Sequence, residues 1–153
     1  MDFDKAQLKA RVMALCAGED EEITLMATLA CEIHLADRRC SWTGFYRVVA
    51  PKLLKVGPYQ GGHGCLSIAF GQGVCGTAAQ TEQIQLVPDV HDFTGHIACS
   101  PTTRSELVVP VFNKTRRLLA VLDLDSEKLA AFTDEDAIFY QHLLDEVFAE
   151  INL

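Results

Sequence analysis

A change of pattern at Trp42 constrains the fold of this chain more than any other feature of the sequence. Before it, apolar residues recur at helical spacing, which predicts helices over residues 4–17 and about 20–37. Residues 41–49 are instead rich in aromatic and β-branched side chains, as strands are. Helical spacing returns after Thr133, which predicts a long last helix with Thr133 as N-cap and acidic residues in its first turn. The sheet-forming residues therefore lie between two helical segments.

The central part of the chain predicts about six strands and one short helix. The strands are expected at residues 41–49, 52–56, 65–70, 84–87, 106–112 and 117–124, and the short helix at 73–80. Helices segregated from a mainly antiparallel sheet form an α+β domain, and 153 residues suit a single domain covering 1–153. We expect the N- and C-terminal helices to pack on one face of the sheet, with apolar stripes that include Leu15, Leu35 and Ile138. The other face is then free to carry a ligand pocket.

Composition and charge exclude several classes of function. The formal net charge is −8 and the 13 basic residues are scattered, whereas nucleic-acid binding needs a concentrated positive face. Residues 1–22 carry charges throughout and lack the apolar centre of a signal peptide, and no stretch approaches the ~20 apolar residues of a membrane span. We therefore expect a cytoplasmic protein that binds neither nucleic acid nor membrane, in a compartment that keeps thiols reduced.

Two carboxylates end an otherwise apolar strand. The apolar run of residues 118–125 closes with Asp123 and Asp125, which point to the same side because side chains alternate along a strand. Glu106 begins the preceding strand, and antiparallel pairing through a short turn would place it beside both. Adjacent carboxylates here are costly unless a cation or several donors meet them, which points to a site for an amine or a hard metal. The alternative is that Asp125 caps the following turn and Asp123 bonds a local backbone amide.

Three of the six cysteines, Cys65, Cys75 and Cys99, lie in glycine-rich or irregular sequence. Residues 57–76 hold seven of the ten glycines, and Cys75 falls in the first turn of the short helix, where a helix N-terminus lowers a thiol pKa. Cys99 lies in the stretch 88–104, which has no periodicity and the length of a functional loop.

None of these three cysteines belongs to a CxxC or CxxH pair, so their spacing does not favour a zinc site. His96 is close enough in sequence to influence Cys99. The alternative for the three thiols is simple packing. The same interpretation is preferred for the remaining cysteines, which are Cys16, Cys31 and Cys40.

The predicted strand at 41–49 carries two aromatic residues, Trp42 and Tyr46, which share a face because they are four residues apart. They could form an aromatic wall around a ligand, or they could be ordinary core or edge residues. The glycine-rich stretch contains neither GxGxxG after a strand nor GxxxxGK[ST], so nucleotide binding lacks its usual loop.

Taken together, these segments resemble the free methionine-(R)-sulfoxide reductases, which are stand-alone GAF-domain enzymes. The similar segments are Trp42–Tyr46, GVCGTA at 73–78, VPDV at 87–90, HIAC at 96–99, SELVVP at 105–110 and LDLDS at 122–126. The resemblance covers nearly the whole chain. GVCG or LDxDS alone occurs in many GAF domains, and the specific part is the cysteine trio at separations of ten and twenty-four, combined with HIAC.

The resemblance implies a GAF-like fold and a role for each candidate residue. Cys99 would be the attacking thiolate, and either Cys65 or Cys75 would resolve its sulfenic acid. The acids Glu106, Asp123 and Asp125 would bind the substrate or polarise its sulfoxide. The aromatic residues Trp42 and Tyr46 would enclose the methyl-sulfoxide end of the substrate. The sequence departs from the family at Ser100, where an acid is more usual, and in the composition of 101–104.

The resemblance also implies the reaction partners. The substrate would be free methionine-(R)-sulfoxide, whose ammonium group the acidic trio could receive, with no metal or organic cofactor required. An outside dithiol, thioredoxin, would reduce the disulfide. The resemblance together with the long terminal helices suggests a homodimer. Two other functions stay open at this point: a non-catalytic GAF sensor or dimerisation module, since a fold alone does not define a function, and a thiol redox switch without a dedicated substrate.

Overall fold

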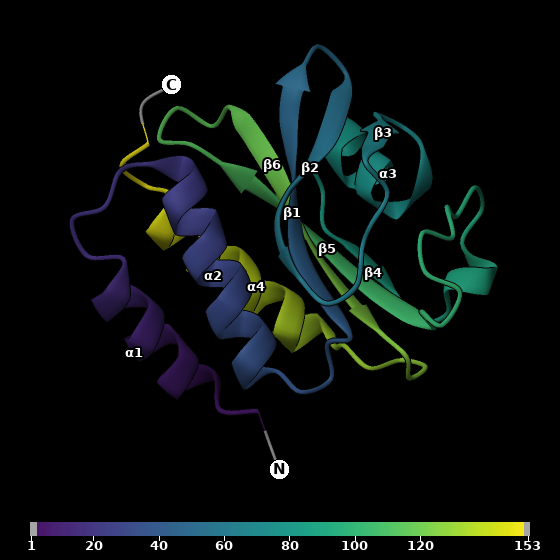
Figure 1. The fold of residues 1–153 in the computed structure, drawn as a ribbon, viewed down its shortest axis with the longest axis horizontal. Coiled ribbons are helices and arrows are strands. Elements are labelled where there is room, and N and C mark those ends of the chain that lie inside the picture. The colour runs from purple at the N-terminus through teal and green to yellow at the C-terminus, as the bar shows by residue number, and fades with distance from the viewer. Residues whose placement is uncertain (1–2, 152–153) are drawn as a thin grey trace.

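The computed structural model describes residues 3–151 and is built around one six-stranded sheet (Figure 1). Its strands are β1 (Trp42–Ala50), β2 (Leu53–Gln60), β3 (Ser67–Ala69), β4 (Gln85–Val87), β5 (Ser105–Phe112) and β6 (Leu118–Ser126). They lie in the order β3-β2-β1-β6-β5-β4, and every neighbouring pair is antiparallel. The expected α+β architecture with an antiparallel sheet is confirmed.

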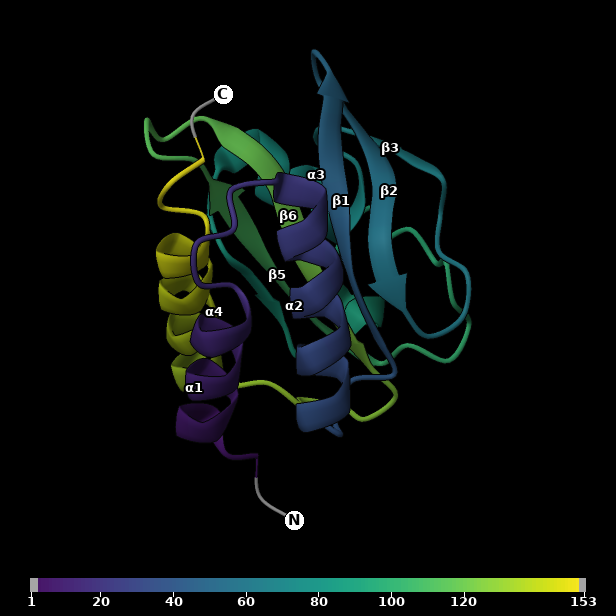
Figure 2. The ribbon, with the colours of Figure 1, turned by 60° about the vertical axis from the view of Figure 1, so that its left-hand side comes forward.

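Three helices cover one face of this sheet and a fourth lies on the other. Figure 2 shows α1 (Lys5–Leu15), α2 (Glu22–Ala36) and α4 (Asp134–Val147) on the same side of the strands, with α1 as the outermost layer. The short helix α3 (Gly73–Thr81) packs on the opposite side. The terminal helices therefore share one face, as the sequence predicts. No helix within residues 3–151 is both long and apolar enough to cross a membrane.

Each central strand contributes to two separate apolar layers because its side chains alternate. On β5 and β6, Leu107, Leu122 and Leu124 point toward the helices and are completely buried. Val108 and Val121 point the other way and pack with residues of α3. One pair of strands thus supports the helix-side core and, on its opposite face, the floor beneath α3.

The helix ends follow the expected capping chemistry. Thr133 caps α4, and its hydroxyl and the Asp136 carboxylate form a reciprocal capping box. Three residues expected in apolar stripes are nevertheless exposed, namely Leu15 (57%), Leu35 (63%) and Ile138 (56%). Leu35, for example, lies two residues after the buried Ile33, which places it on the opposite side of a 3.6-residue helix. The prediction was wrong at these positions because it drew the apolar stripes too wide.

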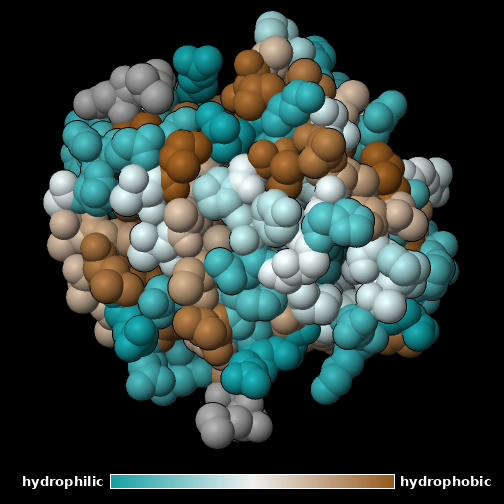
Figure 3. Space-filling model, in the orientation of Figure 1, coloured by the Kyte–Doolittle hydropathy of each residue, from teal (hydrophilic) through white to brown (hydrophobic). Residues whose placement is uncertain are grey.

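The glycine-rich stretch and the segment before β5 form most of the pocket-side surface. Predicted strand 65–70 shortens to β3, so Cys65 lies in a loop, whereas predicted strand 52–56 extends to Gln60. The stretch 88–104 is irregular except for the 3-10 turn η1 (Val90–Asp92). Polar and apolar side chains are interspersed on the face shown in Figure 3.

Candidate active site

Sheet register brings the three predicted carboxylates together. Glu106 on β5 is directly opposite Asp125 on β6, and Asp125 is also opposite Trp42 on β1. Asp123 lies two residues back along β6 and therefore points to the same face, away from α2 and α4. The predicted juxtaposition of the acids is confirmed. In the turn after β6, Lys128 N donates to Ser126 Oγ at 3.2 Å, so Ser126 rather than Asp125 accepts from this turn.

Two members of the acidic trio, Glu106 and Asp123, are buried, Asp125 is half-buried, and the trio has few partners. Glu106 is 6% exposed and Asp123 is 4% exposed. His96 Nε2 lies 3.8 Å from Glu106 Oε1, but burial lowers the pKa of this imidazole and so disfavours its charged form. One oxygen of Asp123 and one of Asp125, Oδ1 in each case, has no hydrogen-bond partner among residues 3–151. Burial and then the neighbouring carboxylates raise the pKa of Glu106 and Asp125 well above the usual range, and burial raises the pKa of Asp123.

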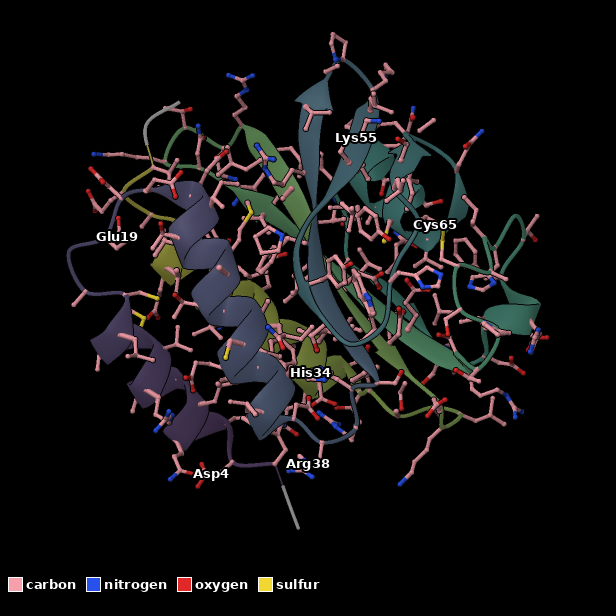
Figure 4. All side chains as sticks on the ribbon, viewed as in Figure 1. Asp4, Glu19, His34, Arg38, Lys55 and Cys65 are labelled. Atoms are coloured by element: carbon pink, nitrogen blue, oxygen red, sulfur yellow. A yellow bond between two sulfur atoms is a disulfide. The ribbon has the colours of Figure 1, made fainter. Side chains whose placement is uncertain are left out.

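The three cysteines of interest divide into a bonded pair and a free thiol. Cys65, from the loop after β2, is disulfide-bonded to Cys99, from the loop before β5, with Cα atoms 5.4 Å apart. Figure 4 shows this sulfur pair beside the Cys65 label, on the side of the sheet away from α1 and α2. The bond ties together two loops that the sequence separates by 34 residues. Sequence analysis left open whether Cys65 or Cys75 pairs with Cys99.

Cys75 is free, 4% exposed and close to the acids, with its Sγ 4.0 Å from Glu106 Oε2. Burial and then the charges of Asp123 and Glu106 raise the pKa of this thiol well above its usual value. The expectation of a lowered pKa at a helix N-terminus was wrong here, because the helix effect is outweighed by burial beside carboxylates. The other predicted packing cysteines lie elsewhere: Cys40 is buried, and Cys16 and Cys31 are half-buried.

Trp42 and Tyr46 share a face of β1 and stack with ring centroids 5.8 Å apart. Tyr59 of β2, which sequence analysis did not single out, stacks on Trp42 at 5.2 Å. The indole Nε1 donates a hydrogen bond of 2.7 Å to the Gly62 carbonyl, which fixes the ring against the glycine-rich loop. A Cβ at Gly64 would approach the Tyr46 hydroxyl to 2.8 Å, so this position requires the absence of a side chain.

These groups line one pocket. Its walls include seven of the eight predicted site residues, namely Trp42, Tyr46, Cys75, Cys99, Glu106, Asp123 and Asp125. Cys99 therefore faces the pocket, whereas Cys65, the eighth, is not among the lining residues. With its mouth, the pocket contains about 520 Å³ of space, part of which is open solvent.

Sequence analysis missed several of the pocket residues, which are His63, Gln72, Gly73, Ile97 and Thr103. Their signal was the concentration of glycines in 57–76 and the long irregular segment 88–104, which marks the region without identifying the contacts. The side chains of Cys75, Glu106 and Asp123 could hold a metal ion, because one ligand atom from each lies within 4.8 Å of the others.

Comparison with known proteins identifies the family of this chain. The sequence model of the GAF domain family matches residues 19–151. The chain is 40% identical over 131 residues to the free methionine-R-sulfoxide reductase of Escherichia coli, covering 86% of this chain and 78% of that protein. It belongs to the free methionine-R-sulfoxide reductase family.

Solved structures agree with the family assignment. The free methionine-R-sulfoxide reductase of Neisseria meningitidis, solved in complex with its substrate, is 35% identical and superposes with a TM-score of 0.88 over 95% of this chain and 86% of that one. The reduced form of fRMsr from Staphylococcus aureus is 31% identical, with a TM-score of 0.93 over 99% and 97% of the two chains. The resemblance read from the sequence and the GAF-like fold expected for a free methionine-R-sulfoxide reductase are thus confirmed.

Proposed function

We propose that this protein reduces free L-methionine-(R)-sulfoxide to L-methionine, with Cys99 as the nucleophile. The observation that carries the proposal is that Cys99 lines the same pocket as the acidic trio and the aromatic pair Trp42 and Tyr46. Membership of the free methionine-R-sulfoxide reductase family supports the same reaction. We also propose that residues 1–153 act as one GAF-like domain.

The proposed chemistry begins at sulfur. The Cys99 thiolate attacks the sulfoxide sulfur, and oxygen is transferred with protonation, so that methionine leaves and Cys99 becomes a sulfenic acid. The Cys65 thiol then attacks the Cys99 sulfur, water leaves, and the Cys65–Cys99 disulfide forms. The two electrons that reduce the sulfoxide come from these two thiols. Their pairing in the structure supports Cys65, rather than Cys75, as the resolving residue.

The acidic trio serves two needs of this reaction. The substrate is a free amino acid, and its ammonium group can bind the unpartnered oxygens of Asp123 and Asp125. A methionine within a protein has no such charge, so the trio favours the free amino acid. Burial and then the acidic neighbours raise the pKa of Glu106, which favours its protonated form, and the protonated carboxyl can donate to the sulfoxide oxygen.

The oxidised enzyme must be returned to its dithiol form by a reductant of the thioredoxin class. Cys65 does not line the pocket, so an outside dithiol can attack its sulfur without entering the substrate site, which releases Cys99 as the leaving thiolate. Such recycling requires a reducing compartment, which is why we place the protein in the cytoplasm. A homodimer stays a prediction.

Turnover of purified protein with each methionine sulfoxide epimer tests the proposal. With a dithiol reductant, we expect methionine from the R epimer and none from the S epimer. Cys99→Ser should abolish turnover, while Cys31→Ser, at a half-buried cysteine of α2, should leave it unchanged. Activity that survives in Cys99→Ser would show that Cys99 is not the nucleophile.

Two further measurements separate the alternatives. Peptide mapping after a single turnover should find the Cys65–Cys99 bond and leave Cys75 unbonded. A sensor module would bind the sulfoxide without consuming it. A thiol switch would form the same bond with peroxide and fail to form it with the sulfoxide.

A further inference from the structure

Three side chains beside the pocket are placed so that together they could hold a metal ion. Cys75 comes from the first turn of α3, Glu106 from β5 and Asp123 from β6, and one ligand atom of each lies within 4.8 Å of the others. All three residues are buried. Their positions are distant in sequence, so no spacing motif could reveal the group, and only the packing of α3 against the sheet assembles it.

An independent observation, a buried oxygen without a hydrogen-bond partner, favours cation binding by this group. Asp123 is 4% exposed, and its Oδ1 has no hydrogen-bond partner among the described residues. A buried carboxylate oxygen without a donor is costly, and a bound cation removes that cost. The contact between Cys75 Sγ and Glu106 Oε2, at 4.0 Å, shows that the sulfur belongs to the same polar cluster.

We propose that Cys75, Glu106 and Asp123 bind a thiophilic divalent cation of the Zn²⁺ class and that this ion inhibits the enzyme. One sulfur and two carboxylate oxygens suit Zn²⁺, whose ligands lie at ~2.0–2.3 Å, whereas Mg²⁺ and Ca²⁺ require oxygen ligands alone. Atoms within 4.8 Å of one another need only small side-chain rotations to surround one ion. On binding, the Cys75 thiol releases its proton to solvent and forms a sulfur–metal bond, with no change of oxidation state.

The surroundings allow a fourth ligand. His96 Nε2 lies 3.8 Å from Glu106 Oε1, so its imidazole can reach an ion held by that carboxylate. Without His96, the fourth position is open to water, as in zinc sites with three protein ligands. Because Cys75 is not part of the disulfide, the site is present even when Cys65 and Cys99 are bonded.

The inhibition rests on the proposed function, whereas the metal binding does not. The ion would occupy the position proposed for the substrate ammonium, because both use Asp123. Metal and substrate should therefore exclude each other. To bind the ion, the Glu106 carboxyl would also release to solvent the proton that the proposed reduction needs.

Cobalt(II) binding to the oxidised protein tests the metal site without using activity. Since Cys65 and Cys99 are bonded in that form, a sulfur-to-cobalt charge-transfer absorption must come from a free cysteine. We expect the band in wild type and in Cys31→Ser and its loss in Cys75→Ser. A band that persists in Cys75→Ser, or that never forms in wild type, would overturn the proposal.

A second variant guards against an unfolded Cys75→Ser protein. Asp123→Asn keeps the thiol and the shape of the side chain, and we expect it to weaken Zn²⁺ binding at least about tenfold in competition with a chromophoric chelator. Equal affinity in wild type and Asp123→Asn would overturn the ligand assignment. Free L-methionine, which carries the same ammonium group, should displace cobalt. The cobalt band could depend on Cys75 and yet keep its intensity when methionine is added. That result would refute the inhibition and leave the metal site supported.

Discussion

Two groups of buried carboxylates lie on opposite sides of the sheet, and their surroundings differ. On the helix side, Asp37 and Asp136 both bind Arg39, with N–O distances of 2.8 Å. Lys5 adds a second cation to Asp136 at 2.8 Å, and the Tyr140 hydroxyl donates to Asp37 at 2.8 Å. Every one of these partners is part of the protein itself, so this group is complete without a ligand.

On the pocket side, the acidic trio of Glu106, Asp123 and Asp125 is recorded with no arginine or lysine partner among residues 3–151. The pKa values of the carboxylates in the two groups shift in opposite directions. Burial raises the pKa of Glu106 well above its usual range, whereas for Asp136 the hydrogen bonds of Arg39 and Lys5 overcome burial and lower the pKa. The comparison teaches that burial alone does not define a site. A carboxylate is available to a ligand when it is buried without a cationic partner in the protein, whereas a structural carboxylate has such a partner.

The largest expected effect comes from replacing the proposed proton donor of the pocket-side group. Glu106→Gln keeps the side-chain shape and removes the proton donor, so we expect kcat to fall by ~10²–10⁴-fold, the usual contribution of general acid catalysis. The free energy of unfolding at neutral pH should stay the same or rise, because no partner cation is left unpaired. Steady-state kinetics with the R epimer and urea unfolding check the two parts.

The control for this variant is Glu135→Gln, which changes an exposed acid in the first turn of α4. Its kinetics should match wild type. If Glu106→Gln kept the wild-type kcat, Glu106 would not be the proton donor and could contribute only to substrate binding.

The next effect is a loss of stability on the helix side. Asp136→Asn weakens the contacts to Arg39 and Lys5, and we expect the free energy of unfolding to fall by roughly 1.5–3 kcal/mol, the range for hydrogen bonds to charged groups. Turnover per folded molecule should not change. Asp134→Asn, at an exposed position of the same helix end, should stay within about 0.5 kcal/mol of wild type. Equal stability of the two variants would contradict the structural role of Asp136.

Sequence analysis predicted much of this comparison on the pocket side and little on the helix side. Alternation along a strand and a short turn between β5 and β6 determine which residues are neighbours, so the position of Glu106 beside Asp125 could be predicted. The capping of α4 by Thr133 is local and was also predictable. The contact of Arg39 with Asp136 joins residues 97 positions apart and has no local signal.

The irregular loops limited the site prediction. Residues 88–104 have no periodicity and residues 57–76 are rich in glycine, so sequence alone could not decide whether Cys65 or Cys75 approaches Cys99. The pKa of Cys75 was wrongly predicted because its burial among carboxylates depends on how α3 packs against the sheet. The family resemblance supplied the proposed roles of these residues, which no spacing argument had given.

The smallest effect is a difference in the pH dependence of stability. The pKa of Glu106 is raised in the folded state, so its contribution is fully present below the unfolded value of ~4.3 and is lost as pH rises through the folded pKa. The pKa of Asp136 is lowered, so its contribution is present above ~3.9 and is lost as pH falls. The free energy of unfolding of wild type should therefore decline as pH rises, because of Glu106, and as pH falls, because of Asp136.

Urea unfolding between about pH 3 and 9 can separate these contributions. A single group changes the free energy of unfolding by at most ~1.4 kcal/mol per pH unit. Glu106→Gln should flatten the decline on the alkaline side only, with a residual slope from Asp123 and Asp125, whose pKa values burial also raises. Asp136→Asn should flatten the acid side only. If Glu106→Gln instead flattened the acid side, Glu106 would be a stabilised carboxylate, and the contrast between the two faces of the sheet would not hold.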